Sequence, residues 1–315
     1  MNTSAEAAPA PARTGPARTG PAPRPRGSRR FALETRLFGI ARWGVIAATV
    51  LACAGPLVYG IFLSMRSMTD VVNNPLRIIP ALSGWDLSAY GTALRSEAEG
   101  GFGLARFMTN SALVAVGTMV LVVLFSVLGA YAAVRLRFFG RDVVNGLFLA
   151  VYLLPTIVLA VPLFVMFSRM GVRRSLLSLV IIYLAQTVPL ALYMLRNYFI
   201  AVPRTVEEAA MIDGCTRLQT IRKVVIPIAV PGIVATALYV FMIAWNEFLF
   251  ALLFLIDDRQ RWTVSLGVHQ LSDALTVSPT ILMAGSIAIT MPIVIVFMLA
   301  QKALVTGLTA GAEKG

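Results

Sequence analysis

Residues 204–227 read RTVEEAAMIDGCTRLQTIRKVVIP, and this polar stretch lies between two long apolar ones. Each of its charged side chains would cost roughly 2.5 to 3.5 kcal/mol if it were placed at the centre of a membrane-spanning helix. The stretch is therefore expected to lie in water, against the membrane surface. The apolar stretches on either side of it are expected to cross the membrane.

The composition of the whole chain is that of an integral membrane protein. The 315 residues are 58% hydrophobic and 13% charged, with a mean hydropathy of +0.79, whereas soluble domains carry about 25% charged residues. Six stretches are nearly free of charge and exceed the roughly 17 residues that a helical span needs. They cover residues 43–65, 107–134, 143–168, 175–195, 229–256 and 274–301. Barrel strands would be alternating segments of about 10 residues, so an all-α, polytopic membrane protein with six transmembrane helices is predicted.

Lys and Arg are distributed unevenly about these spans. Of the 27 basic residues, 18 lie on the side that holds both termini and 9 on the other. By the positive-inside rule, both termini are expected in the cytoplasm. Arg169, Arg173 and Arg174 run against this trend, because they fall in a short outer loop. The net charge of +12 is thus interpreted as a topology signal and not as a nucleic-acid-binding surface.

Two regions are expected on composition. Residues 1–36 are rich in Pro, Ala and Arg and are predicted to be a disordered cytoplasmic tract attracted to anionic membrane lipid. Residues 37–315 are predicted to form the transmembrane domain. Neither a metal site nor a cofactor is expected, because His269 has no Cys or paired carboxylates at ligand spacing. Cys53 and Cys215 fall in different compartments and are not expected to pair.

The polar stretch is predicted to form two short helices joined by a tight turn. Thr205 and Glu208 fit a capping box that would start the first helix, and Thr216 and Gln219 fit a second one. Gly214 would supply the left-handed residue between the helices.

Pro227 is expected to stop the second of these helices. Both are too short to be stable alone, so another surface must cover their apolar sides. Either they pack only on their own bundle, with Glu208 merely a cap, or they bind a partner. Asp213 indicates a partner or a local cap, because a carboxylate in a last helical turn opposes the helix dipole.

The pattern resembles the EAA loop of ABC importer permeases. Glu208, Ala209, Ala210 and Gly214 are followed at the family's spacing by Val-Val-Ile-Pro at 224–227. The motif Trp-Asn-Glu-Phe at 245–248 and the tail Gly-Leu-Thr-Ala-Gly at 307–311 are similar to the carbohydrate uptake branch of that family, which is maltose-transporter-permease-like. The resemblance covers residues 37–315.

The resemblance implies a type I importer permease of the bacterial cytoplasmic membrane. Its loop, residues 196–228, would dock on cytoplasmic ABC ATPase subunits, and a second homologous permease subunit and an extracytoplasmic solute-binding protein would complete the importer. The implied cargo is a sugar, a mono- or oligosaccharide, moved by alternating access. The residues implied in coupling are Glu207, Glu208, Ala209, Ala210, Asp213, Gly214 and Pro227.

The chain carries no G-x-x-x-x-G-K-[ST] phosphate-binding loop. It is therefore predicted to be a transport subunit and not an enzyme, with ATP hydrolysed on another polypeptide.

Glu247 is the only carboxylate inside a predicted span, and such a charge is a functional candidate. With Asn246 it either lines the translocation path or pairs with a polar group of the partner permease. Other functions stay open: an ABC importer of a polyamine, phosphate or amino acid, a membrane receptor or scaffold, and an ion-coupled transporter. The last is disfavoured because Glu247 has no second acid or histidine within the spans.

Overall fold

The computed structural model describes residues 28–80, 84–273 and 277–312, and every regular element in these ranges is helical. Residues 1–27 of the expected disordered tract lie outside the described residues. Residues 28–36, which the sequence placed in the same tract, are the first turns of a helix.

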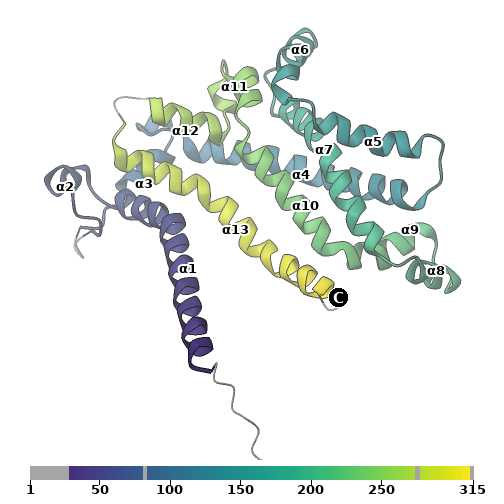
Figure 1. Ribbon diagram of the computed structural model, residues 1–315. Coiled ribbons are helices and arrows are strands. Elements are labelled where there is room, and N and C mark those ends of the chain that lie inside the picture. The colour runs from purple at the N-terminus through teal and green to yellow at the C-terminus, as the bar shows by residue number, and fades with distance from the viewer. Residues whose placement is uncertain (1–27, 81–83, 274–276, 313–315) are drawn as a thin grey trace, which may run out of the picture. The chain divides into compact units, whose positions relative to one another are not determined.

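The described helices are labelled along the chain in Figure 1. In chain order the α-helices are α1 Ser28–Ser64, α2 Met68–Asn73, α3 Ser88–Leu94, α4 Leu104–Arg135, α5 Arg141–Tyr152, α6 Thr156–Arg169, α7 Leu176–Ala201, α8 Arg204–Ile212, α9 Arg217–Thr220, α10 Ile226–Asn246, α11 Leu249–Leu255, α12 Val264–Asp273 and α13 Pro279–Ala312. Two 3₁₀ turns, Glu97–Glu99 and Arg259–Arg261, and a π-helical turn, Ile221–Val225, complete them.

Among the described residues, five helical stretches are long and apolar enough to cross a membrane. They are Leu37–Ser64, Leu104–Arg135, Leu176–Ala201, Arg217–Asn246 and Pro279–Leu304. A sixth exists only if α5 and α6 count as one span, because the chain bends by 92° between them.

The third span predicted over residues 143–168 is thus present only as this sharply bent pair of helices. The bend coincides with Pro155, which precedes the first residue of α6. Proline has no N–H to donate to the preceding turn, and it disfavours helical backbone at the residue before it. Hydropathy could not reveal the bend, because residues on both sides of it are apolar.

The predicted fifth span, residues 229–256, is wrong at both ends. The helix ends at Asn246, since Glu247 has extended backbone with φ −65° and ψ 131°, and α11 starts separately after it. At the other end the helix starts at Arg217, because the π turn carries α9 into α10.

Pro227 therefore does not stop the second short helix, contrary to the sequence prediction. It lies in the first turn of α10, where the missing N–H costs little. The π turn before it pairs the amide of Ile226 with the carbonyl of Ile221.

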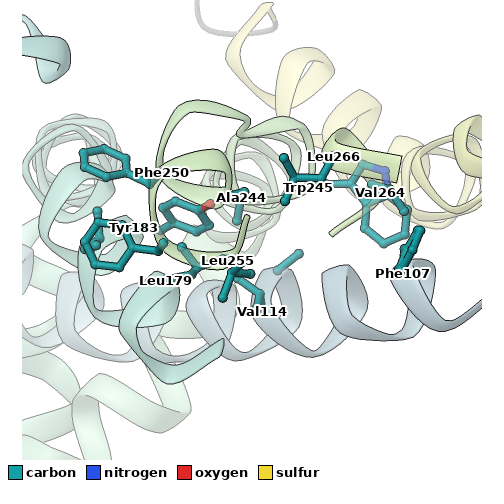
Figure 2. Packing of buried hydrophobic residues seen from close by; sticks show 14 of the residues in the cluster. Phe107, Val114, Leu179, Tyr183, Ala244, Trp245, Phe250, Leu255, Val264 and Leu266 are labelled. Atoms are coloured by element: carbon teal, nitrogen blue, oxygen red, sulfur yellow. The ribbon is translucent and has the colours of Figure 1, made fainter. Parts of the chain in front are cut away.

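In the described chain, three hydrophobic clusters hold the bundle together, and two of them are large. Helix α4 packs along α7 and α10, and α10 packs along α13 (Figure 1). Tyr183, Trp245 and Phe250 lie in the larger cluster together with residues of α4 and α12 (Figure 2). A smaller cluster contains Tyr131 and Phe199 from the ends of α4 and α7 and Val225 from the π turn. The smaller cluster lies directly beside the α8–α9 loop.

The chain divides into two compact units, residues 1–56 and 57–315. In the described part of the first unit, the apolar side chains from residue 37 onwards are mostly exposed. The second unit contains every site discussed below.

Asp257 pairs with two of the three outer-loop arginines, whose position runs against the uneven distribution of Lys and Arg. Its carboxylate accepts hydrogen bonds from Arg173 Nη2 at 2.6 Å and Arg174 Nη2 at 3.2 Å. The hydrogen bond from Arg173 lowers the pKa of Asp257 below its ordinary value. Two of the three outer-loop arginines are thus paired with a carboxylate.

Candidate functional site

The polar stretch forms a compact helical hairpin. At the end of α8 the amides of Asp213, Gly214 and Cys215 bond to carbonyls of the last helical turn. Gly214 has φ +86°, in the left-handed region that favours glycine. The predicted left-handed residue is thus confirmed.

The two predicted capping boxes have different outcomes. Thr216 accepts from the amide of Gln219 while the Gln219 side chain accepts from the amide of Thr216, so the second box is confirmed. The box predicted at Thr205 and Glu208 is wrong, because α8 already begins at Arg204, directly after Pro203. The fixed φ of proline suits the residue before a helix, and Thr205 lies too far inside α8 to cap it.

The coupling residues named from sequence divide between the two sides of α8. Glu208, Ala209, Asp213 and Gly214 are exposed, and Ala210 is half-buried. Glu207 is only 4% exposed and faces the bundle.

Several large apolar side chains of the hairpin are exposed as well. Ile212 is 85% exposed and Leu218 is 68% exposed, and Val206 and Met211 are also exposed. Nothing in the described chain covers these four side chains, so the hairpin presents an apolar surface rimmed by charges. Such a surface is typical of a protein-binding site.

Glu247 lies at the break between α10 and α11. Its carboxylate accepts hydrogen bonds from Tyr183 Oη at 2.5 Å and from the amides of Phe250 at 2.9 Å and Ala251 at 3.2 Å. The amides belong to the first turn of α11, where a negative charge is favoured by the helix dipole. The charge is therefore bound within its own chain, and neither a free path-lining carboxylate nor a pair with another subunit is needed to explain it.

Two pockets lie close to this break. The first, about 520 Å³, is lined by Asn246 and, from α12 and α13, by polar side chains that include Ser265, Ser272 and Thr290. Phe248 also lines it and stacks on His269, with ring centroids 5.1 Å apart. The structure thus places Asn246 on a pocket, but Glu247 does not line it.

The second pocket, about 230 Å³, lies between the α5–α6 bend, α7 and α10. Its polar lining includes Gln186, Thr156, Tyr152 and Tyr239. The Oε1 atom of Gln186 is buried and accepts no hydrogen bond from the described residues. A buried amide oxygen without a donor is costly, so a ligand hydroxyl would be favoured there.

No sequence pattern singled out Gln186, Tyr152 or Tyr239. An amide in the middle of an apolar span was the available signal for Gln186. The two tyrosines carried no signal of their own, because aromatic residues are common throughout the apolar stretches.

Residues 125–309 match the family described as "Binding-protein-dependent transport system inner membrane component". The chain is 32% identical over 272 residues to the sulfoquinovosyl glycerol transport system permease protein SmoH of Agrobacterium fabrum, which covers 86% of this chain and 93% of SmoH. It is 39% identical over 210 residues to the trehalose/maltose transport system permease protein MalG of Thermococcus litoralis, which covers 66% of this chain and 75% of MalG.

A solved structure also matches the fold. The crystal structure of a bacterial ABC transporter involved in the import of the acidic polysaccharide alginate aligns with a TM-score of 0.74 and 23% sequence identity. The alignment covers 85% of this chain and 97% of that one.

Proposed function

The chain belongs to the family of binding-protein-dependent transport system inner membrane components, and we propose that it carries a sugar across a bacterial cytoplasmic membrane. It is a permease subunit and not an enzyme. The observation that carries the proposal is the match over nearly the whole of SmoH, whose name specifies a sugar derivative. The match to a trehalose/maltose permease supports the same class of substrate.

The chemistry of the two pockets fits a neutral, hydroxyl-rich solute. Their linings combine aromatic rings with amide and hydroxyl groups, and in the described chain neither pocket is lined by Asp, Glu, Lys or Arg. A polyamine would call for carboxylates and a phosphate for basic side chains. Gln186 and Asn246 are the two amides that we assign to the translocation path.

We assign the hairpin of α8 and α9, within the loop 196–228, to the contact with a cytoplasmic ABC ATPase. The exposed side chains Glu208, Ala209 and Asp213 and the apolar surface around Ile212 support this assignment. ATP would then be hydrolysed on the partner, and movement of the partner would be passed to the spans.

The remaining parts of the importer follow from the family description and from the surface of the chain. A solute-binding protein would deliver the sugar at the face opposite the hairpin. A second homologous permease subunit and membrane lipid would cover the exposed apolar side chains of α1 and of the bundle. Both termini would be cytoplasmic, with residues 37–315 as the permease domain.

Crosslinking tests the contact with the ATPase. Ala209→Cys is combined with Cys215→Ser and Cys53→Ser in the complete importer, and a thiol-to-amine crosslinker is applied to vesicles. We expect a crosslink to the ATPase subunit. The assignment would be refuted if the crosslinks reached only other subunits. It would also be refuted if an importer that still transports sugar gave no crosslink.

Charge reversal tests the function in the same vesicles. Glu208→Lys places a positive charge on the exposed side of α8, and we expect ATP-driven sugar uptake to be lost while the protein stays in the membrane. Asp142→Lys is the matched control, since Asp142 is an exposed carboxylate of the α4–α5 region; it should transport normally. Normal uptake by the Glu208 variant would contradict the coupling role.

A further inference from the structure

One guanidinium group joins three helices at the base of the hairpin. Arg135, the last residue of α4, binds Oε1 of Glu207 through Nε at 2.7 Å and through Nη2 at 2.6 Å. The same Nη2 donates to the carbonyls of Phe199 at 3.1 Å and Val202 at 2.7 Å, at the end of α7. Arg135 thus links α4 to α7 and to the first turn of α8.

The ion pair is buried and its hydrogen bonds are well satisfied. The side chains of Arg135 and Glu207 are 9% and 6% exposed. The second carboxylate oxygen of Glu207 accepts from Tyr131 Oη at 3.2 Å. A buried pair repays its loss of hydration only when the remaining polar atoms are bonded, and that condition is met here.

The ion pair also joins two helices, α8 and α4, that otherwise pack little against each other. Besides this contact, α8 packs chiefly on α9 and the π turn, which continue its own loop. The chain connects α8 directly to α7 through Val202 and Pro203, but α4 has no covalent connection nearby. Through Arg135 and Tyr131, Glu207 therefore gives α8 a direct side-chain contact with α4, beside the indirect paths through α7 and α10.

We propose that the Glu207–Arg135 ion pair is the positioning contact that makes α4 follow α8, so that movement of the ATPase-binding hairpin is converted into movement of the transmembrane spans. The inference rests on the proposed coupling role of the hairpin. It gives Glu207 a task different from that of its neighbour Glu208, which is exposed and which we assign to the contact with the ATPase.

The test compares sugar transported with ATP hydrolysed in the same vesicles of the reconstituted importer. For Glu207→Gln and Arg135→Gln we expect the ratio to fall about fivefold or more, the lower end of common coupling effects, while the ATPase subunits stay bound. Arg135→Lys keeps the charge but not the planar set of N–H donors that reaches both Glu207 and the α7 carbonyls, and it should give an intermediate ratio. Asp142→Asn removes an exposed carboxylate of the α4–α5 region and should leave the ratio unchanged.

A double variant separates coupling from stability. Glu207→Met with Arg135→Met leaves no unpaired buried charge, and such replacements often preserve folding. We expect this importer to assemble and to hydrolyse ATP, and we expect its ratio of sugar transported to ATP hydrolysed to stay as low as in the single variants. The inference would be overturned if the assembled double variant transported as much sugar per ATP as the unmodified importer. It would also be overturned if sugar transport and ATP hydrolysis fell in parallel in the single variants. If instead the unmodified importer shows no ATP-driven uptake, the proposed function itself fails.

Discussion

Adjacent residues on a short helix can serve different purposes because they point about 100° apart. Glu207 is buried against Arg135, whereas Glu208 is exposed beside the apolar surface of the hairpin. A prediction that treats the two glutamates as one unit therefore merges a buried, ion-paired carboxylate with an exposed one. The same distinction applies to Glu247, which the structure binds to its own chain.

Glu247→Gln tests whether the carboxylate holds the break between α10 and α11. Gln keeps the size but removes the charge that accepts from Tyr183 and from the first turn of α11. Hydrogen bonds to charged groups contribute about 1.5 to 3 kcal/mol each, so we expect a lower unfolding temperature and slower sugar uptake, with membrane insertion retained. Thermal unfolding of the purified importer and uptake in vesicles measure both effects.

Tyr183→Phe is the matched variant for this prediction. It removes one donor but leaves the carboxylate on the α11 amides, so the loss of stability should be smaller. A double-mutant cycle between the two positions should show coupling, because the groups are in direct contact. If Glu247→Gln had wild-type stability and uptake, the carboxylate would not hold the break, and Glu247 would be an ordinary packing residue.

Some of these residues could be predicted from sequence patterns, but their interaction partners could not. Glu247 could be selected because a lone carboxylate in an apolar span is costly. Its partner Tyr183 is 64 positions away, and Arg135 lies 72 positions from Glu207. Such pairings depend on how the spans pack, which hydropathy and capping patterns do not specify.

The helices themselves were mostly predictable, because each long apolar run needs internal hydrogen bonds to cross a membrane. The differences from prediction lie where helices bend, break or join: the bend at Pro155, the break at Glu247 and the π turn before Pro227, through which the helix continues. Proline could be seen at two of these places, but its effect depends on position. Pro155 precedes a new helix after a bend, whereas Pro227 lies harmlessly in a first turn.

Gly214→Ala tests the turn between α8 and α9. A Cβ at this position would meet no atom within 4 Å, so the cost is that of the left-handed backbone alone, about 1 to 2 kcal/mol. We expect the hairpin to loosen and the ATPase to bind more weakly, measured by its retention during purification of the importer. Gly140→Ala has the same open surroundings and a φ of +79° in another loop, so it should cost similar stability but retain the ATPase. Equal retention in both variants would argue against a role of the turn in docking.

Gly232→Ala tests the close approach of α7 and α10. The added Cβ would lie 2.2 to 2.6 Å from ring atoms of Tyr198, so the ring or a helix must move. Overpacking of this kind typically costs about 1 to 3 kcal/mol, and we expect a lower unfolding temperature. Gly117→Ala is the matched control, because its Cβ would make an ordinary 3.9 Å contact with Val180. Equal unfolding temperatures in the two variants would show that the helices are not held this closely.

At the scale of the whole molecule, α4, α7 and α10 connect the hairpin to the pockets. Arg135 ties the hairpin to α4 and α7, and the π turn makes α9 continuous with α10. Helix α10 ends at the break at Glu247, and residues close to this break line both pockets. A displacement of the hairpin would thus reach the lining of both pockets through packed helices, as alternating access requires.

The orientation of the whole chain can be tested with its own cysteines. The two-to-one excess of Lys and Arg on the side of the termini predicts that the hairpin is cytoplasmic. Once Cys53 is replaced by Ser, the thiol that remains to react is that of Cys215, which is half-buried in the hairpin. A membrane-impermeant maleimide should then label inside-out vesicles strongly and right-side-out vesicles weakly. Cys215→Ser should abolish the labelling, which assigns it to this residue. Stronger labelling of right-side-out vesicles would place the hairpin outside, where no ATPase could reach it, and the coupling mechanism would fail with the topology.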